Sequence, residues 1–313
     1  MHQVSVIIPA YGVTRYIAEA LDSVFAQTFS DYEIVVINDG CPDTEALERV
    51  LAPYRDRITY LKQPNGGPSQ ARNAGIVASS APFVAFLDGD DVWEPSYLER
   101  QLSFLRENPS IDAVYSDGVI IGDHPDAGRR LMDLSPSEGE VTFARLVTQE
   151  CTVFLPLTAR REAIVRAGMF TPQFRNVEDF DLWLRMLLSG AKFAYQRLPL
   201  FRYRRRKGSL SEDSVAMRRA AVQVLERFKV SPKITAAERS AIEKGEARFQ
   251  AEIYLFEGMR AFEARDTVRA VENLRAANRQ LHDRRLGLKV FLLRWCPELA
   301  YAGARLWRTS GRR

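Results

Sequence analysis

The chain has 313 residues, of which 46% are hydrophobic and 27% are charged, a balance typical of folded globular proteins. This composition excludes a disordered chain, a collagen-like fibre and a small disulfide scaffold. The three cysteines, Cys41, Cys151 and Cys296, are widely spaced and predict a protein of a reduced compartment.

Charge is distributed unevenly along the chain. Residues 1–200 hold 18 Lys and Arg against 27 Asp and Glu, a net charge of −9, whereas residues 201–313 hold 26 against 13, a net charge of +13. This asymmetry predicts two regions with different partners, the basic one facing an anion. No leader and no apolar run of about 20 residues is evident. We therefore expect a cytoplasmic protein, either in solution or peripheral on the inner face of the cell membrane.

The first half alternates short apolar runs with segments of helical periodicity. Strands are expected over 4–8, 33–37, 58–61 and 82–87. Helices are expected over 14–27 and 44–52 and from Pro68, because proline is favoured in the first turn of a helix. Apolar strands that alternate with helices predict an α/β fold with a doubly wound, mostly parallel sheet flanked by helices.

The second half is mixed and then helical. Short strands are expected over 113–115, 119–121, 193–195 and 200–203, with a loop over 122–139. A helix is expected over 177–189, because Gly190 is a favoured residue just after a helix. From about Ser214 the pattern is helical, and residues 256–277 predict one helical hairpin.

Residues that can supply an aromatic ring and carboxylates to a site follow three of the expected strands in the first half. They are Pro9-Ala10-Tyr11 after the first strand, Asp39-Gly40 after the second, and Asp88-Gly89-Asp90-Asp91 after the fourth. Ligands of doubly wound sheets bind beyond the carboxyl ends of the strands. We therefore expect these residues to share one site.

The acidic run predicts a cation site. Three carboxylates within four residues repel one another unless positive charge lies between them, and magnesium pairs such carboxylates with substrate phosphates. The alternative is a solvated acidic turn that caps the next helix. The strand before the run and Asp39 beside it favour a divalent cation, Mn²⁺ or Mg²⁺, with a diphosphate.

Three further residues describe a nucleotide pocket. Tyr11 can stack on a flat base, Asp39 can accept a hydrogen bond from its N–H, and Arg72 can contact a phosphate or a base carbonyl. The structural alternatives are a ring covering the sheet edge, a turn residue and an exposed helix cation. Neither standard glycine-rich phosphate loop is present, which weighs against a dinucleotide enzyme and a P-loop ATPase.

In combination and order, these motifs resemble the inverting family 2 glycosyltransferases, which have a GT-A fold. The resemblance covers about residues 3–211 and rests on five segments, namely 4–11, 35–40, 66–75, 83–93 and 178–185. It implies a catalytic domain over 1–212, followed by a basic α-helical region over 213–313. It further implies transfer of a sugar, with inversion, from a nucleotide-diphospho-sugar, expected to be UDP-linked. The acceptor would be a carbohydrate or lipid-linked hydroxyl, as in cell-surface polysaccharide biosynthesis.

The resemblance also implies roles for individual residues. Donor binding falls on Pro9, Ala10, Tyr11, Asp39, Arg72, Asp88, Gly89, Asp90 and Arg206. Asp88 and Asp90 form the Asp-x-Asp pair, Asp88 facing the ribose or sugar and Asp90 the metal, with Asp91 as a competing metal ligand. Trp93 and Glu178 fall at the acceptor site.

Asp179 is implied as the catalytic base. A sugar hydroxyl is a poor nucleophile near neutral pH, and a carboxylate within hydrogen-bond reach can take its proton. The alternative for Glu178 and Asp179 is a pair of acids that favour a helix N-terminus. Asp181 and Trp183 are expected to be structural.

Two positions depart from the family pattern. Gly12 stands where an Asn is frequent, and Arg206 stands where relatives commonly carry His. Arginine cannot ligate a cation but can bind phosphate directly. We expect Arg206, with Arg204 or Lys207, to supplement or partly replace the metal; the alternative is an exposed basic loop.

Residues 286–313 mix aromatic and leucine residues with basic ones. Such a helix can lie on an anionic membrane surface, and the alternative is a packed helix with a solvated basic face. Nucleic acid is not an expected partner, because no binding module accompanies the charge. Two other classes remain. A nucleotidyltransferase would need a glycine-rich loop that 9–15 lacks, and Asp88, Asp90 and Asp179 argue against a non-catalytic binding protein.

Overall fold

The computed structural model describes residues 2–206, 208–209 and 212–303. The chain divides into two compact units, Met1–Leu146 with Glu150–Ser209 and Val147–Gln149 with Leu210–Arg313. The division expected after residue 212, between a catalytic domain and a basic helical region, stays a prediction.

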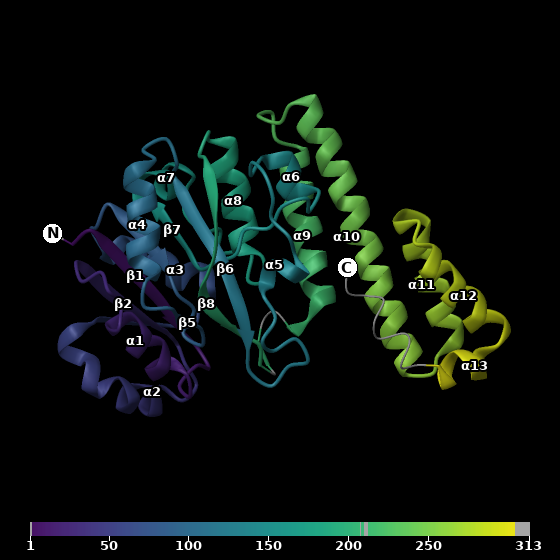
Figure 1. Cartoon of the computed structure of the whole chain (residues 1–313), viewed down its shortest axis with the longest axis horizontal. Helices are drawn as coiled ribbons and strands as arrows, with labels where there is room; N and C mark the ends of the chain where they lie inside the picture. Colours follow the sequence, from purple (N-terminus) through teal and green to yellow (C-terminus); the bar gives the residue numbers. More distant parts are fainter. Residues whose placement is uncertain (1, 207, 210–211, 304–313) are drawn as a thin grey trace. The chain divides into compact units, whose positions relative to one another are not determined.

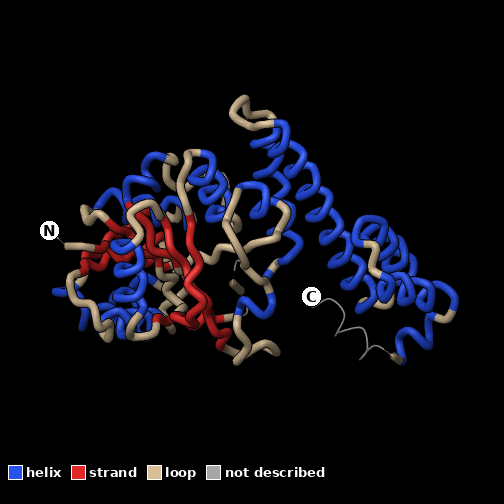
Figure 2. The backbone as a smooth tube through the Cα atoms, turned by 45° about the horizontal axis from the view of Figure 1, so that its top comes forward, coloured by secondary structure: helices blue, strands red, loops and turns tan. Residues whose placement is uncertain are grey.

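The first unit is built on one eight-stranded sheet of order β3-β2-β1-β4-β7-β6-β8-β5 (Figures 1 and 2). Its strands are β1 Val4–Ala10, β2 Tyr32–Asp39, β3 Thr59–Gln63, β4 Phe83–Phe86, β5 Val92–Trp93, β6 Ala113–Ile121, β7 Leu157–Arg160 and β8 Phe193–Arg204. β1 to β4 are mutually parallel, and β8 is parallel to β6. β7 and β5 pair antiparallel with their neighbours, so the sheet is mixed beyond its parallel half.

Helices cover both faces of the parallel half. They are α1 Ile17–Phe25, α2 Thr44–Leu51, α3 Pro68–Ala78 and α4 Tyr97–Glu107, with a 3₁₀ turn over Ala52–Arg57. Val6 and Ile8 of β1 belong to a core cluster with residues of α1, α2 and α4. Ile7 points to the other face, where a Cβ added at Gly75 of α3 would lie 2.6 Å from its side chain. Glycine therefore lets α3 approach the sheet closely, and the α/β prediction is confirmed.

Two pairs of expected short strands are single long strands in the structure. Residues 113–115 and 119–121 both belong to β6, and residues 193–195 and 200–203 both belong to β8. The β6–β8 register shifts twice between Ser116 and Gly118, which interrupts the apolar pattern. β7 was not expected, because a strand of four residues carries little periodicity.

The remaining helices of this unit lie in its second half. They are α5 Leu131–Leu134, α6 Phe143–Val147, α7 Arg161–Arg166 and α8 Glu178–Leu188. α5 lies inside the expected loop over 122–139. α8 agrees with the helix expected over 177–189.

The second unit is helical, as expected. Its helices are α9 Ser214–Lys229, α10 Ala236–Glu263, α11 Thr267–Leu281, α12 Arg284–Trp295 and α13 Pro297–Ala302. The predicted hairpin joins α10 to α11, where a Cβ at Gly258 would lie 2.7 Å from the Leu274 side chain. Among the described residues, no helix combines the length and apolar character needed to cross a bilayer.

Candidate active site

The ends of β1 and β2 finish level with each other. Ala10 pairs with Asn38 in the parallel register, so Tyr11 and Asp39 follow at the same sheet edge. The Tyr11 side chain is 49% exposed, which suits a ring that stacks on a ligand rather than one that fills the core. The structure therefore places these two predicted residues together.

Asp39 is occupied by the protein itself. Its carboxylate is 2% exposed and accepts hydrogen bonds from the amides of Gly66 (2.9 Å) and Gly67 (2.8 Å) and from Gln63 Nε2 (2.7 Å). Gly67 has a φ of +82°, a left-handed conformation that glycine adopts without strain. Asp39 thus holds the loop that leads into α3, and its expected bond to a base stays a prediction.

The acidic turn lies against the end of β1. A Cβ added at Gly89 would come within 2.9 Å of Val13 and 3.1 Å of the Pro9 carbonyl oxygen. Only glycine therefore lets residues 88–91 pack so closely beside Pro9 and Ala10. The two predicted strand-end motifs are brought together in this way.

Arg72 lies inside this site rather than on its surface. The residue is 3% exposed, and its Nη2 donates to Asp88 Oδ1 while its Nη1 donates to Glu178 Oε1, both at 2.6 Å. The guanidinium therefore links the acidic turn to the start of α8. The exposed-cation alternative is wrong, and this burial does not support a direct contact between Arg72 and a donor.

The three aspartates of the turn lie in different environments. Asp91 is buried; its Oδ1 accepts from the Arg204 amide at 2.8 Å, and its Oδ2 has no partner among the described residues. Burial raises the pKa of Asp91 well above its ordinary value, and the neighbouring Asp90 and Asp88 raise it further. Burial and Asp88 also raise the pKa of Asp90. The carboxyls of Asp90 and Asp91 therefore favour a bound proton or another positive partner.

The donor atoms fit a divalent cation in part. Asp88 uses Oδ1 for Arg72 and Asp90 uses Oδ2 for Arg206, so each brings a second carboxylate oxygen to the turn. Among the described residues, no group of three or more His, Cys, Asp or Glu forms a complete metal site. Mg²⁺ ordinarily takes one or two carboxylates and completes its shell with water and substrate phosphates. The residues present match that kind of site rather than an all-protein cage.

Arg204 and Arg206, at and just beyond the end of β8, also contact the acidic turn. Arg206 Nε donates to Asp90 Oδ2 at 2.6 Å, and Arg204 Nε donates to the Asp90 carbonyl at 2.7 Å. Both guanidinium groups lie over the Tyr16 ring, at 4.8 Å for Arg204 and 5.7 Å for Arg206. Arg206 is therefore part of the site rather than an exposed loop residue. Lys207 lies outside the described residues.

Glu178 and Asp179 begin α8. Glu178 is buried, and that burial raises its pKa to about 7 although Arg72 opposes the shift. Burial likewise raises the pKa of the half-buried Asp179, with Asp88 adding to the effect. A carboxylate with a raised pKa is a stronger proton acceptor. The carboxyl of Glu178 is turned toward Arg72, so the structure gives it a linking role in place of the expected acceptor contact.

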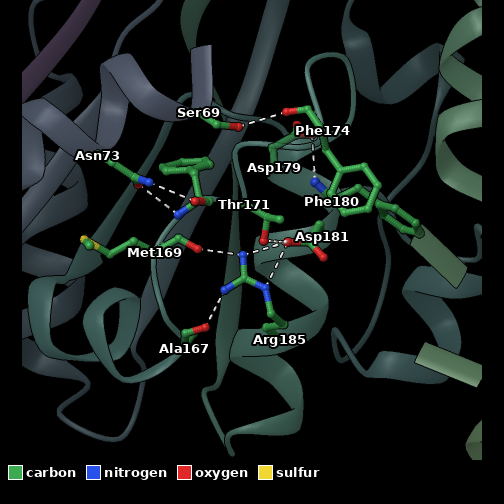
Figure 3. Close-up of polar contacts among 11 residues, drawn as sticks. Ser69, Asn73, Ala167, Met169, Thr171, Phe174, Asp179, Phe180, Asp181 and Arg185 are labelled. Carbon is green, nitrogen blue, oxygen red and sulfur yellow. Dashed lines mark hydrogen bonds and ion pairs between the residues drawn. The ribbon is translucent and has the colours of Figure 1, made fainter. Parts of the chain in front are cut away.

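Partly buried hydrogen bonds fix the start of α8 (Figure 3). Asp181 Oδ2 accepts from Thr171 Oγ1 at 2.6 Å and from Arg185 Nε at 2.9 Å. Arg185 also donates to the carbonyls of Met169 (2.6 Å) and Ala167. The structural role expected for Asp181 agrees with these contacts.

Helix α3 is tied to the same segment. Asn73 exchanges two hydrogen bonds with the backbone of Phe170, at 2.8 and 2.9 Å, and Ser69 Oγ donates to the Phe174 carbonyl at 2.9 Å (Figure 3). Sequence reasoning assigned no role to Asn73 or Arg185. Both lie inside segments that carry the family resemblance, and this position in the sequence is the signal that could have identified them.

Trp93 is a correction to the expected site. Its ring is 2% exposed and stacks on Tyr97 with centroids 4.1 Å apart, within the main core cluster. A ring in this position packs the core and does not present a face to an acceptor. We therefore remove Trp93 from the acceptor site.

Comparisons with known proteins agree with this geometry. Residues 5–156 match the family described as Glycosyl transferase family 2. The chain is 45% identical over 165 residues to the succinoglycan biosynthesis protein ExoW of Rhizobium meliloti, covering 50% of this chain and 49% of that protein. It is 31% identical over 193 residues to an uncharacterized glycosyltransferase of Rickettsia felis, covering 59% of this chain and 31% of that protein. The chain thus spans less than two thirds of these relatives.

Solved structures show the same fold. TarS 1–349 of S. aureus, in complex with UDP-GlcNAc, superposes with a TM-score of 0.64 at 18% identity, over 96% of this chain and 89% of that chain. The mannosyltransferase PcManGT of Pyrobaculum calidifontis, with GDP-Man and Mn²⁺, gives 0.62 at 17% identity, over 98% and 88%. Likeness at this identity concerns the fold, whereas the family match rests on sequence. Residues 5–156 form a glycosyl transferase family 2 domain, and the chain has a GT-A fold.

Proposed function

We propose that this protein is an inverting, metal-dependent glycosyltransferase that moves a sugar from a nucleotide-diphospho-sugar to a hydroxyl acceptor. The observation that carries the proposal is the buried Arg72, which joins Asp88 of the acidic turn to Glu178 beside Asp179. A donor-binding carboxylate and a candidate base are thereby held in one rigid network, as a displacement between two bound substrates requires.

On the donor side, Tyr11 would stack on the base, which we propose is uracil, and Pro9 and Ala10 would shape the pocket. Asp88 and Asp90 would hold the cation, with Asp91 as the competing ligand. The cation would supply positive charge to the departing diphosphate. Asp39 would hold the Gly66–Gly67 loop in place. Its remaining carboxylate lone pairs would accept a hydrogen bond from an N–H of the base.

On the acceptor side, Asp179 would take the proton of the attacking hydroxyl. Its raised pKa makes it a better base than an ordinary aspartate, provided that the pH is high enough to ionise it. A single base opposite the leaving group gives inversion at the anomeric carbon. Activity should therefore rise with pH on the acid side of the optimum.

Arg206 would supplement the cation. It is already paired with Asp90, and a guanidinium can donate two parallel hydrogen bonds to a phosphate. When donor binds, Arg206 would share the diphosphate charge while keeping Asp90 in place. This arrangement would serve in place of the histidine that relatives commonly carry.

The product class and location complete the proposal. ExoW is named for succinoglycan biosynthesis, which supports a carbohydrate or lipid-linked acceptor and a role in polysaccharide synthesis. TarS was solved with UDP-GlcNAc and PcManGT with GDP-Man, so both uridine and guanosine donors belong in a first screen. We place the protein in the cytoplasm, peripheral to the membrane where such acceptors are held.

Asp179→Asn tests the catalytic assignment. Release of nucleoside diphosphate should be lost while donor affinity, measured by calorimetry with Mn²⁺, stays nearly unchanged. The matched control is Asp56→Asn, at an exposed residue of the 3₁₀ turn, and it should retain activity. Full turnover by Asp179→Asn would refute the base assignment. Release of pyrophosphate from a nucleoside triphosphate and a sugar 1-phosphate would instead indicate a nucleotidyltransferase.

A further inference from the structure

The second unit carries an open groove of about 580 Å³ between α11 and α12. Arg275 and Arg279 line it from α11, and Phe291, Arg294 and Trp295 line it from α12. The two helices face the groove with one side each, because Arg275 and Arg279 are four residues apart and Phe291 and Trp295 are also four apart. The two helices thus bring three guanidinium groups and two aromatic rings to one groove.

Glycine keeps the groove open at its floor. Gly287 lies in its lining, and a Cβ at this position would come within 3.2 Å of Asn278 Nδ2 on the facing helix. The opposite sides of both helices form the core of this unit, with Leu274, Leu286 and Leu293 buried there. The groove therefore lies on the outer side of a packed helix pair.

The arginines of this groove lack the carboxylate partners that several other cations of the unit have. Arg218 pairs with Glu252 at 3.0 Å, and Lys229 pairs with Glu246 at 2.7 Å. Within the described part of the chain, Arg275, Arg279 and Arg294 pair with no carboxylate, and no acid lines the groove. Three exposed guanidinium groups around one cavity leave positive charge that an anion would neutralise.

Apolar side chains extend the groove along α12. Phe291 is 59% and Trp295 is 63% exposed, and Leu288, three residues before Phe291 on the same helix, is also exposed. Exposed apolar groups of this size, next to basic residues, are typical of a surface that lies in the headgroup region of a bilayer. Trp is the residue most suited to that region, because its ring is apolar and its N–H is polar.

We propose that this groove binds the phosphate headgroups of an anionic lipid surface, with Arg275, Arg279 and Arg294 on the phosphates and Phe291 and Trp295 in the interface. The inference rests on the proposed peripheral location and names the residues that produce it. Phosphate is favoured because arginine donates to it in bidentate fashion.

Vesicle co-sedimentation of the full chain tests the proposal without donor or acceptor. The vesicles contain phosphatidylcholine alone, or phosphatidylcholine and phosphatidylglycerol in equal parts. The wild-type chain should bind only the anionic vesicles. The triple variant Arg275→Gln, Arg279→Gln, Arg294→Gln should bind about 100-fold more weakly, since each basic residue near the surface adds roughly a factor of five.

A matched triple variant separates this groove from overall charge. Lys233→Gln, Lys244→Gln and Arg269→Gln remove the same charge from exposed positions of the same unit outside the groove and should bind nearly as wild type does. Phe291→Ser with Trp295→Ser should weaken binding at all salt concentrations, because that contribution is apolar. All five groove positions are exposed, so these variants should keep the wild-type circular dichroism.

Three results would overturn the proposal. They are wild-type binding that ignores phosphatidylglycerol, equal losses in the two triple variants, and displacement from vesicles by millimolar inorganic phosphate, which would make the groove a site for a soluble phosphate. Release of nucleoside diphosphate during sugar transfer to a soluble acceptor should be unchanged in the groove variant. A failed vesicle assay and a failed transfer assay therefore report on different proposals.

Discussion

The buried Glu178 predicts an unusual dependence of stability on pH. Burial raises the pKa of its carboxyl from an ordinary 4.5 to about 7 in the folded protein, despite the ion pair with Arg72. The folded state therefore holds this proton more tightly than the unfolded state does. Stability that is present near pH 4.5 is lost as the pH rises toward 7.

The size of the effect follows from the shift. At about 1.4 kcal/mol per pKa unit, a rise from 4.5 to about 7 corresponds to about 3 kcal/mol lost once the group is ionised. Glu178→Gln keeps the shape and an acceptor for Arg72 but cannot ionise. Asp90, Asp91 and Asp179 also have raised pKa values, but they are present in both proteins, so the difference between the two isolates Glu178.

Urea unfolding of both proteins from about pH 4.5 to 8, with a chelator present, measures this difference. Buried Trp93 and Trp183 provide a fluorescence signal from the first unit. Relative to wild type, Glu178→Gln should gain about 3 kcal/mol across this range. A difference that stays constant with pH would refute the reasoning. A wild type that gains stability relative to the variant as the pH rises would show that Arg72 outweighs burial and keeps Glu178 ionised.

Three further predictions concern the donor site. Arg206→Ala should weaken donor binding about tenfold, whereas Arg202→Ala, four residues earlier on β8, should not; equal affinities in calorimetry would make Arg206 structural only. Tyr11→Ala should weaken nucleotide binding about tenfold through lost stacking and Tyr11→Phe should not, as read by fluorescence titration; equal losses in both would contradict stacking. Mn²⁺ should raise the melting temperature of the first unit more at pH 7.5 than at pH 5, because burial raises the pKa of Asp90 and protons therefore compete more strongly with the cation at low pH. Asp90→Asn should remove that difference, and a shift independent of pH or of Asp90 would place the cation elsewhere.

The sheet edge that carries the site could be predicted from the sequence because its signals are local. Apolar runs locate β1, β2 and β4, and parallel strands finish at a common edge. The residues at or just after the end of each strand, Tyr11, Asp39 and Asp88, are therefore neighbours in any parallel arrangement of these strands. The helix that begins at Glu178 is equally local, since acids at its start and Gly190 at its end mark its bounds.

Only the tertiary structure decided which charges meet. Arg72 and Glu178 are 106 residues apart, and Arg206 and Asp90 are 116 apart. The first contact depends on how α3 packs beside α8, and the second depends on how β8 pairs with β5. No local pattern encodes either arrangement. Trp93 shows the same limit. Neighbouring residues of a strand point to opposite faces of the sheet, and only the structure shows that the Trp93 ring lies on the core face. Residue types and spacing thus determined the chemistry available at the sheet edge. The packing of distant segments determined which of those groups link to one another, because ion pairing and burial depend on three-dimensional proximity and not on separation along the chain.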